Sequence, residues 1–133
     1  MIVLDASAVL ELLVGTTRGQ EVGERIADPA LGLHAPHLVD VEVLQALRRY
    51  VRGGEIDEAS AALALEDLRS LDVERHSHEP LLARVWDLRG NFTAGDAVYV
   101  ALAEALDTKL LTCDGRLGRA PGMRGRVDVV GRA

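Results

Sequence analysis

The sequence predicts one α/β domain built around a mainly parallel sheet. Short apolar segments alternate along the chain with longer segments in which apolar residues recur at helical spacing. The composition is that of a single globular domain over residues 1–133, because 48% of the residues are hydrophobic and 27% are charged. No repeat, linker or low-complexity segment divides the chain. Strands that alternate with helices in this way are typical of parallel sheets with helices on their faces.

Five short segments are predicted to form strands. The first contains four apolar residues without a polar interruption, as expected of a strand that is buried on both faces. Pro36 fits the exit of the second strand, because proline has no backbone N–H to donate to a neighbouring strand. The predicted strands are residues 1–4, 31–35, 73–76, 109–112 and 127–130.

Glycine, proline and capping residues set the boundaries of the helices. Gly15 ends the first helix and Pro29 stops the second, while Gly53 and Gly54 close the third. Thr93 is placed to cap the most apolar helix of the chain. The predicted helices are residues 7–14, 16 or 17 to 28, 37–52, 55–71, 79 or 80 to 89, and 94–106.

Composition also constrains location and partners. No apolar run is long enough to cross a bilayer and no secretory signal is recognisable, so we expect a soluble, cytoplasmic protein that does not associate with membranes. The single cysteine, Cys113, cannot form an internal disulfide. The net charge of −6 does not suggest a protein that coats nucleic acid, although arginines gather in residues 48–52 and 116–126.

Four carboxylates from distant segments are predicted to meet at one edge of the sheet. Asp5 and Asp114 follow predicted strands, and Glu42 and Asp96 lie in the first turns of predicted helices. In a parallel sheet these positions all face the crevice beyond the carboxyl ends of the strands, where ligands bind. We therefore expect one acidic pocket.

Such a pocket indicates metal-assisted hydrolysis. Two unit charges about 4 Å apart repel by about 4 kcal/mol at an effective dielectric near 20, so the cluster requires protonated carboxyls or a hard cation. Oxygen donors favour Mg²⁺ or Mn²⁺, and no Cys/His set with zinc spacing competes. Ions of this kind can activate a water and stabilise the leaving oxygen of a phosphodiester.

Four segments resemble the PIN-domain ribonucleases, and most closely the VapC toxins of toxin–antitoxin pairs. They read IVLDAS (2–7), APHLVDVEV (35–43), NFTAGDAVYVALAE (91–104) and LLTCDGRL (110–117). Each segment alone is a weak match, but together they follow the family's order over nearly the whole chain.

The resemblance implies roles for individual residues. Ser7 and Thr112 match hydroxyl positions that orient carboxylates or bound water, and Thr93 matches the polar residue before the third acid. Gly95 departs from the pattern, since many relatives carry an aromatic or larger residue there, and this is expected to loosen the rim of the pocket. The implied catalytic and metal-binding quartet is Asp5, Glu42, Asp96 and Asp114.

The resemblance further implies a PIN-like α/β/α fold with three layers and a five-stranded sheet in the order 3-2-1-4-5. It implies a Mg²⁺-dependent endoribonuclease, with Mn²⁺ as the other candidate ion. The implied partners of the protein are an RNA substrate, a VapB-type antitoxin that inhibits it and a second copy in a homodimer. Arg49, Arg52 and Arg116 are candidate RNA contacts, although solvated arginines are equally common. The alternative function is a catalytically silent PIN module that binds RNA or a protein.

Three positions leave a choice between interpretations. Asp40 competes with Glu42, but two residues along a helix turn a side chain by about 200°, so only one of them faces the pocket; the family match favours Glu42. His76 and His78 alternate as on one strand face, which suggests a metal pair or, as the favoured interpretation, a structural role at the strand edge. Cys113 is interpreted as a small buried residue and not a nucleophile.

Overall fold

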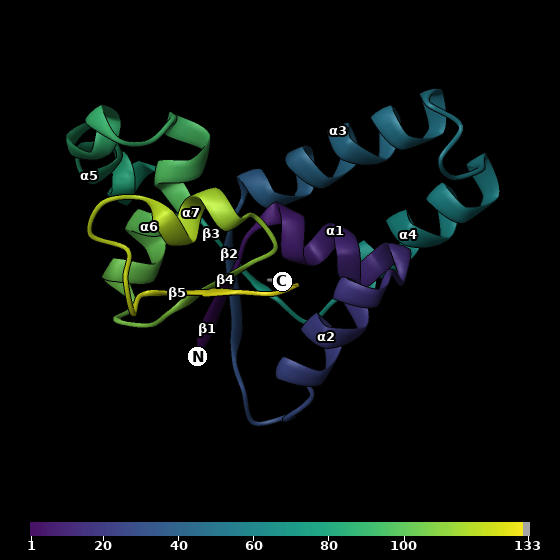
Figure 1. Cartoon of the computed structure of the whole chain (residues 1–133), viewed down its shortest axis with the longest axis horizontal. Coiled ribbons are helices and arrows are strands. Elements are labelled where there is room, and N and C mark those ends of the chain that lie inside the picture. Colours follow the sequence, from purple (N-terminus) through teal and green to yellow (C-terminus); the bar gives the residue numbers. More distant parts are fainter. Residues whose placement is uncertain (132–133) are drawn as a thin grey trace.

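The sheet is parallel throughout, and its strand order agrees with the expectation. The computed structural model describes residues 1–131 and shows the order β3-β2-β1-β4-β5 (Figure 1). All four strand pairs are parallel. The strands are β1 (Ile2–Leu4), β2 (Leu33–Pro36), β3 (Glu74–His76), β4 (Leu110–Thr112) and β5 (Val127–Val129).

Helices cover both faces of this sheet, which confirms the three-layer α/β/α architecture. The helices are α1 (Ala6–Val14), α2 (Thr17–Arg25), α3 (Leu38–Arg52), α4 (Glu58–Ser70), α5 (Leu82–Asp87), α6 (Ala94–Ala105) and α7 (Gly115–Arg119), with short 3-10 turns η1 (Glu79–Leu81) and η2 (Leu88–Gly90) on either side of α5. α1 contacts α2, α3 and α4 on one side, whereas α5 and α6 pack together on the other (Figure 1). No helix within residues 1–131 combines the length and apolarity needed to cross a membrane.

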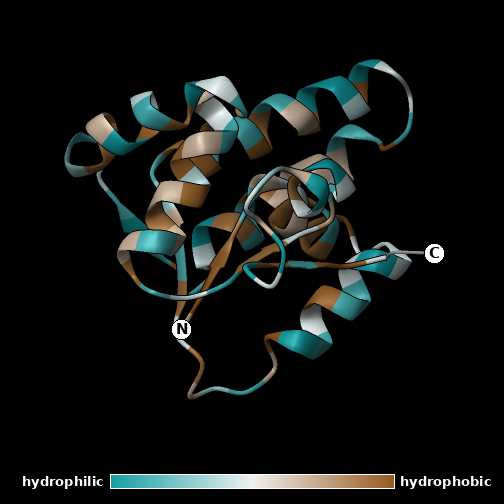
Figure 2. Cartoon of the chain, turned by 60° about the vertical axis from the view of Figure 1, so that its left-hand side comes forward, coloured by the Kyte–Doolittle hydropathy of each residue, from teal (hydrophilic) through white to brown (hydrophobic). Residues whose placement is uncertain are grey.

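The core lies where the two central strands meet α6. Val3 and Leu4 of β1 and Leu110 and Leu111 of β4 are fully buried, and α6 contacts β1, β2 and β4. The strand ribbon in the middle of the sheet is accordingly continuously apolar in Figure 2, while the helices alternate between polar and apolar bands. Burial on both faces explains why an uninterrupted apolar segment, and not an alternating one, forms each central strand.

The observed helix boundaries differ from the predicted ones at three places. The predicted helix 55–71 begins later, because Asp57 caps it by accepting from Ser60 N at 2.7 Å. The predicted helix 79–89 is instead three short helical pieces, η1, α5 and η2, none of which has a side-chain cap. Residues 115–119, which lie outside the predicted helices, form α7, and Asp114 caps this helix by accepting from Arg116 N.

Candidate functional site

All four predicted acids line one pocket at the carboxyl edge of the sheet. The pocket has a volume of about 680 Å³ and is lined by Asp5, Glu42, Asp96 and Asp114 together with residues of α1, α3 and α6. Asp5 and Asp114 follow the neighbouring strands β1 and β4. Glu42 and Asp96 lie near the starts of α3 and α6, two helices that begin at this edge of the sheet. The sequence therefore locates the pocket correctly.

Asp5 is the most buried of these acids and is held on both oxygens. Its Oδ1 accepts from Ser7 Oγ at 2.7 Å and from Ala8 N at 3.0 Å, which makes it the N-cap of α1. Its Oδ2 accepts from Thr112 Oγ1 at 2.5 Å. Burial raises the pKa of Asp5 to about 6, and the charge of Asp114 is the smallest of the contributions. The expected mutual repulsion is thus minor at this residue, and loss of hydration is the main effect.

Ser7 and Thr112 connect the acids as the resemblance implies. Ser7 Oγ accepts from Cys113 N at 2.9 Å, and Thr112 Oγ1 accepts from Asp114 N at 2.9 Å. Both hydroxyls therefore donate to the Asp5 carboxylate while accepting from the loop that carries Asp114. This arrangement fixes the position of one acid relative to the other.

Glu42 has a partner that the sequence did not predict. Tyr99 Oη donates to Glu42 Oε1 at 2.5 Å. Partial burial raises the pKa of Glu42, and the Tyr99 hydrogen bond and the charge of Asp96 act on it in opposite directions. Tyr99 lies three residues after Asp96 on α6, and this helical spacing is the sequence signal that both face the same pocket. Gly95 lies beside this acid, and a Cβ there would be 3.5 Å from Glu42 Oε2, which is an ordinary van der Waals contact.

Asp96 sits in the first turn of α6. Thr93 caps this helix by accepting from Asp96 N at 3.2 Å, so the hydroxyl holds the backbone and not the carboxylate. Within residues 1–131, no hydrogen bond or ion pair to the Asp96 carboxylate is present. Its oxygens are therefore available to a ligand in the pocket.

Asp114 is already paired with a guanidinium. Arg116 Nη2 lies 2.6 Å from Asp114 Oδ2, and Arg116 Nε lies 3.2 Å from each carboxylate oxygen. These contacts lower the pKa of Asp114. Of the other arginines predicted to contact RNA, Arg49 lines the acidic pocket, whereas Arg52 lines a separate groove between α3 and α4.

The structure also settles the position of Asp40. Its carboxylate accepts from Arg75 Nε at 2.7 Å and from Arg75 Nη2 at 2.9 Å, and it does not line the acidic pocket. Glu42 is therefore the acid of this helix that faces the pocket. Cys113 is buried, and burial raises the pKa of its thiol to about 11, which agrees with a packed residue and not a nucleophile.

An ion pair at the rim of the pocket was also missed. Arg18 Nη2 donates to Glu11 Oε1 at 3.1 Å, and Arg18 Nη1 donates to the carbonyl of Cys113 at 3.2 Å. Thr16 Oγ1 donates to the same Glu11 carboxylate. The available signal was Glu11 itself, a single acid within an otherwise apolar helix.

The pocket fits a hydrated divalent cation. It offers carboxylate and hydroxyl oxygens, which are the donors that Mg²⁺ prefers. Within residues 1–131, the three candidate ligands whose donor atoms approach within 4.8 Å of one another are His34, Glu74 and His76, so the four acids are more widely spaced. Mg²⁺ usually keeps several waters and takes only one or two carboxylates directly, which suits this spacing.

Tyr99→Phe is expected to move the pH dependence of the pocket. The phenol stabilises ionised Glu42, so its loss raises the pKa of Glu42 further and shifts the acidic limb of a pH–activity profile to higher pH. Because Glu42 is only half-buried, we expect a roughly tenfold loss of activity on the acidic limb, near the lower end for a hydrogen bond to a charged group, and a smaller loss at higher pH where Glu42 is ionised in both proteins.

Profiles of initial rate against pH for wild type and Tyr99→Phe measure this effect. Tyr50→Phe is the matched control, since Tyr50 lines the same pocket. Superimposable acidic limbs for wild type and Tyr99→Phe would show that the hydroxyl does not act on Glu42.

Comparisons with known proteins identify the family. Residues 2–123 match the PIN domain. The chain is 44% identical over 129 residues to Ribonuclease VapC1 of Mycobacterium tuberculosis, covering 96% of each chain, and 39% identical over 130 residues to Ribonuclease VapC12 of the same organism, covering 98% of this chain and 99% of the relative. The crystal structure of PAE2754 from Pyrobaculum aerophilum is similar with a TM-score of 0.65 and 28% identity, covering 96% of this chain and 83% of that one. The acidic pocket thus lies in a chain that belongs to the PIN-domain family and, within it, to the VapC proteins.

Proposed function

We propose that this protein is a metal-dependent endoribonuclease, the toxin of a toxin–antitoxin pair. The observation that carries the proposal is the convergence of Asp5, Glu42, Asp96 and Asp114 on one pocket. Similarity to proteins named as VapC ribonucleases supports RNA as the substrate. The protein acts as one domain in the cytoplasm.

The four acids would hold Mg²⁺, with Mn²⁺ as the second candidate. When bound, such an ion polarises a water and offsets the charge that develops on the scissile phosphate. Ser7 and Thr112 keep the Asp5 carboxylate oriented, and Tyr99 does the same for Glu42. Asp96 and Asp114 would complete the set, and Asp114 would hold the ion in place of the Arg116 guanidinium. Single-stranded or looped RNA is the proposed substrate, because base edges inside an A-form duplex are inaccessible to side chains.

A VapB-type antitoxin is the proposed inhibitor. An arginine inserted among the acids would neutralise the pocket, and the Asp114–Arg116 pair shows that a carboxylate of this pocket accepts a guanidinium. Large apolar side chains are exposed on α3 and α4, namely Val41, Leu44, Leu63 and Leu65. These side chains support the proposal of protein partners, the antitoxin and a second copy in a homodimer.

Cleavage of total cellular RNA by the purified, antitoxin-free protein tests the function. We expect discrete fragments with Mg²⁺ or Mn²⁺ and none with EDTA, and sequencing of their ends identifies the target. Intact RNA with a folded protein that still binds Mg²⁺ and RNA would favour the silent binding module. Failure to bind Mg²⁺ as well would refute the four-acid site.

A further inference from the structure

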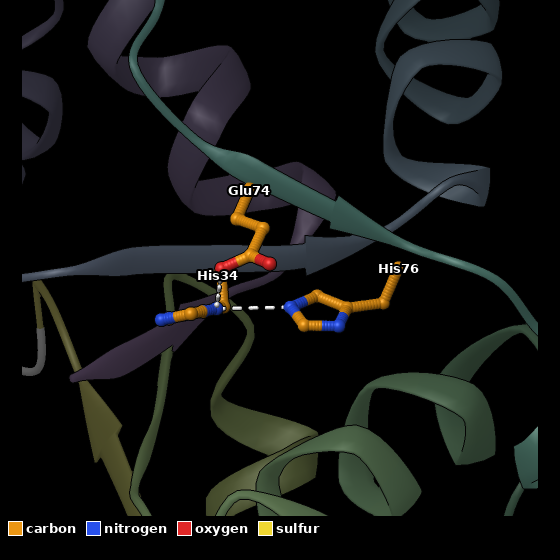
Figure 3. A group of neighbouring side chains, drawn as sticks. All are labelled: His34, Glu74 and His76. Carbon is orange, nitrogen blue, oxygen red and sulfur yellow. Dashed lines mark hydrogen bonds and ion pairs between the residues drawn. The ribbon is translucent and has the colours of Figure 1, made fainter.

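A second group of ligand-forming side chains lies outside the acidic pocket. His34 is on β2, and Glu74 and His76 are on the adjacent strand β3 at the edge of the sheet. The register pairs His34 with Glu74, and residues 74 and 76 are two apart on one strand, so all three side chains project from the same face. Figure 3 shows them converging below the two strands. None of them lines the acidic pocket.

The distances within this group match a metal site. His34 Nδ1 lies 2.9 Å from His76 Nε2 and 3.4 Å from Glu74 Oε2, and all three donor atoms lie within 4.8 Å of one another. In a tetrahedral zinc site with bonds of about 2.0–2.2 Å, ligand atoms are separated by roughly 3.3 Å. The His34–Glu74 separation already has this value, and the His34–His76 separation needs to widen by only a few tenths of an ångström.

The two imidazoles face each other through ring nitrogens. At 2.9 Å, one nitrogen must donate the N–H and the other must present its lone pair, so one proton lies between the rings. His34 is 8% exposed, and burial of this kind disfavours the doubly protonated imidazolium. For a metal ion to bind both facing nitrogens, the donor ring would carry its proton on its other nitrogen, so that both rings stay neutral and both present a lone pair to the ion. Glu74 is largely exposed at the sheet edge and supplies both a negative charge and a route for entry.

We propose that His34, Glu74 and His76 bind one Zn²⁺, with a fourth position open to water. Imidazole nitrogens favour zinc over Mg²⁺ or Ca²⁺, and two histidines with one glutamate form an established type of zinc ligand set. The bound ion clamps the three-residue edge strand β3 to β2. The histidines at this edge then have a ligand-binding role in addition to their place in the strand.

His78 does not belong to this site. Its Nε2 accepts from Leu38 N at 2.9 Å, which is a structural contact at the start of α3. Alternation along the sequence suggested a pair of His76 with His78. The structure instead pairs His76 with His34 of the neighbouring strand. Only the register between β2 and β3 brings His34 to His76.

Titration of the metal-stripped protein with Co²⁺, followed by visible absorption, tests the proposal. Co²⁺ with nitrogen ligands in a tetrahedral site gives strong visible bands, whereas octahedral oxygen coordination in the acidic pocket gives weak ones. We expect strong bands that saturate at one Co²⁺ per chain and disappear when Zn²⁺ is added. His76→Gln should abolish them and weaken Zn²⁺ binding by at least about 100-fold, the upper end of what loss of an outer-shell partner costs.

Two controls separate this site from other effects. His37→Gln removes an exposed histidine close by and should keep the bands. Asp96→Asn alters only the acidic pocket and should also keep them, so the outcome is independent of the nuclease proposal. If the buried His34→Gln variant does not fold, Glu74→Gln and His76→Gln still test the site, with circular dichroism as the check on folding.

The result that would overturn the proposal is equally specific. A wild-type protein without tetrahedral Co²⁺ bands, or bands that persist in His76→Gln, would show that the three residues form only a hydrogen-bonded structural cluster.

Discussion

Asp96→Asn is expected to reduce RNA cleavage by about 1,000-fold or more while leaving the fold intact. A divalent ion supplies several kcal/mol of transition-state stabilisation, and each ~1.4 kcal/mol corresponds to a tenfold change in rate. Asparagine keeps the size of the side chain but removes the charge of Asp96, the one acid of the four in the pocket whose carboxylate has no hydrogen-bonding partner within residues 1–131. Its carboxylate therefore has no hydrogen bond within the described chain to give up when it binds a ligand.

The fold should survive this change because other groups hold the start of α6. Thr93 provides the cap, and residues 97–103 of this helix are all buried. Loss of an acid in the first turn weakens the favourable interaction with the helix dipole by only about 0.3–1 kcal/mol. Circular dichroism and thermal melting should accordingly resemble those of wild type.

Initial rates of cleavage with saturating Mg²⁺ measure the effect. Asp67→Asn is the matched control, because Asp67 is an exposed acid on α4, remote from the pocket. We expect wild-type rates from Asp67→Asn. An Asp96→Asn variant that retains a tenth or more of the wild-type rate would remove this residue from the metal site.

Asp5→Asn is expected to make the metal-free protein more stable at neutral and higher pH. Burial raises the pKa of Asp5 from 3.8 to about 6. Below about 3.8 this carboxyl is protonated in both states, and its contribution to stability is fully present. As pH rises through about 6 the contribution is lost, because the unfolded chain ionises first; the total is about 3 kcal/mol as an upper bound.

Asparagine can enter the same hydrogen-bond network. Its oxygen accepts from Ser7 and Ala8 N as the aspartate does, and its amide can donate to Thr112 Oγ1 if that hydroxyl turns to donate to Ser7 Oγ, 3.2 Å away. The rearranged network offsets part of the gain. We therefore expect Asp5→Asn to exceed wild type in unfolding free energy by about 1–3 kcal/mol at pH 8 in EDTA.

Urea unfolding of both proteins between pH 5 and pH 8 tests the sign of this effect. The difference between them should grow with pH in EDTA and shrink when Mg²⁺ is added, because the ion stabilises wild type by binding its folded state. A wild-type protein that is the more stable of the two at pH 8 in EDTA would contradict the buried-carboxylate account.

Sequence patterns predicted the features that depend on one segment and on the spacing of the apolar residues within it. The apolar segment before Asp5 and the apolar helix after Thr93 identify a parallel sheet, and the ends of those elements locate the acids. The pairing of Tyr99 with Glu42 could not be predicted in this way, because it depends on how α6 faces α3. The His34–His76 contact depends on strand register in the same manner.

Local sequence also gave an incomplete account of the charged residues. Arg116 stays a candidate RNA contact, but the sequence did not predict that the turn at the start of α7 places its guanidinium on Asp114, two residues earlier. The sequence period also did not predict the division of residues 79–90 into η1, α5 and η2, of which α5 packs against α6.

The bond between Thr112 and Asp5 joins residues 107 positions apart. A growing chain emerges from the ribosome with Asp5 first, but this acid has neither its Thr112 partner nor the neighbouring Asp114 until most of the chain has been made. Such long-range contacts form late, because a large loop must close before they contribute. The proposed four-acid site therefore cannot be complete until β4 and Asp114 have been synthesised, so translation of most of the chain precedes assembly of the site.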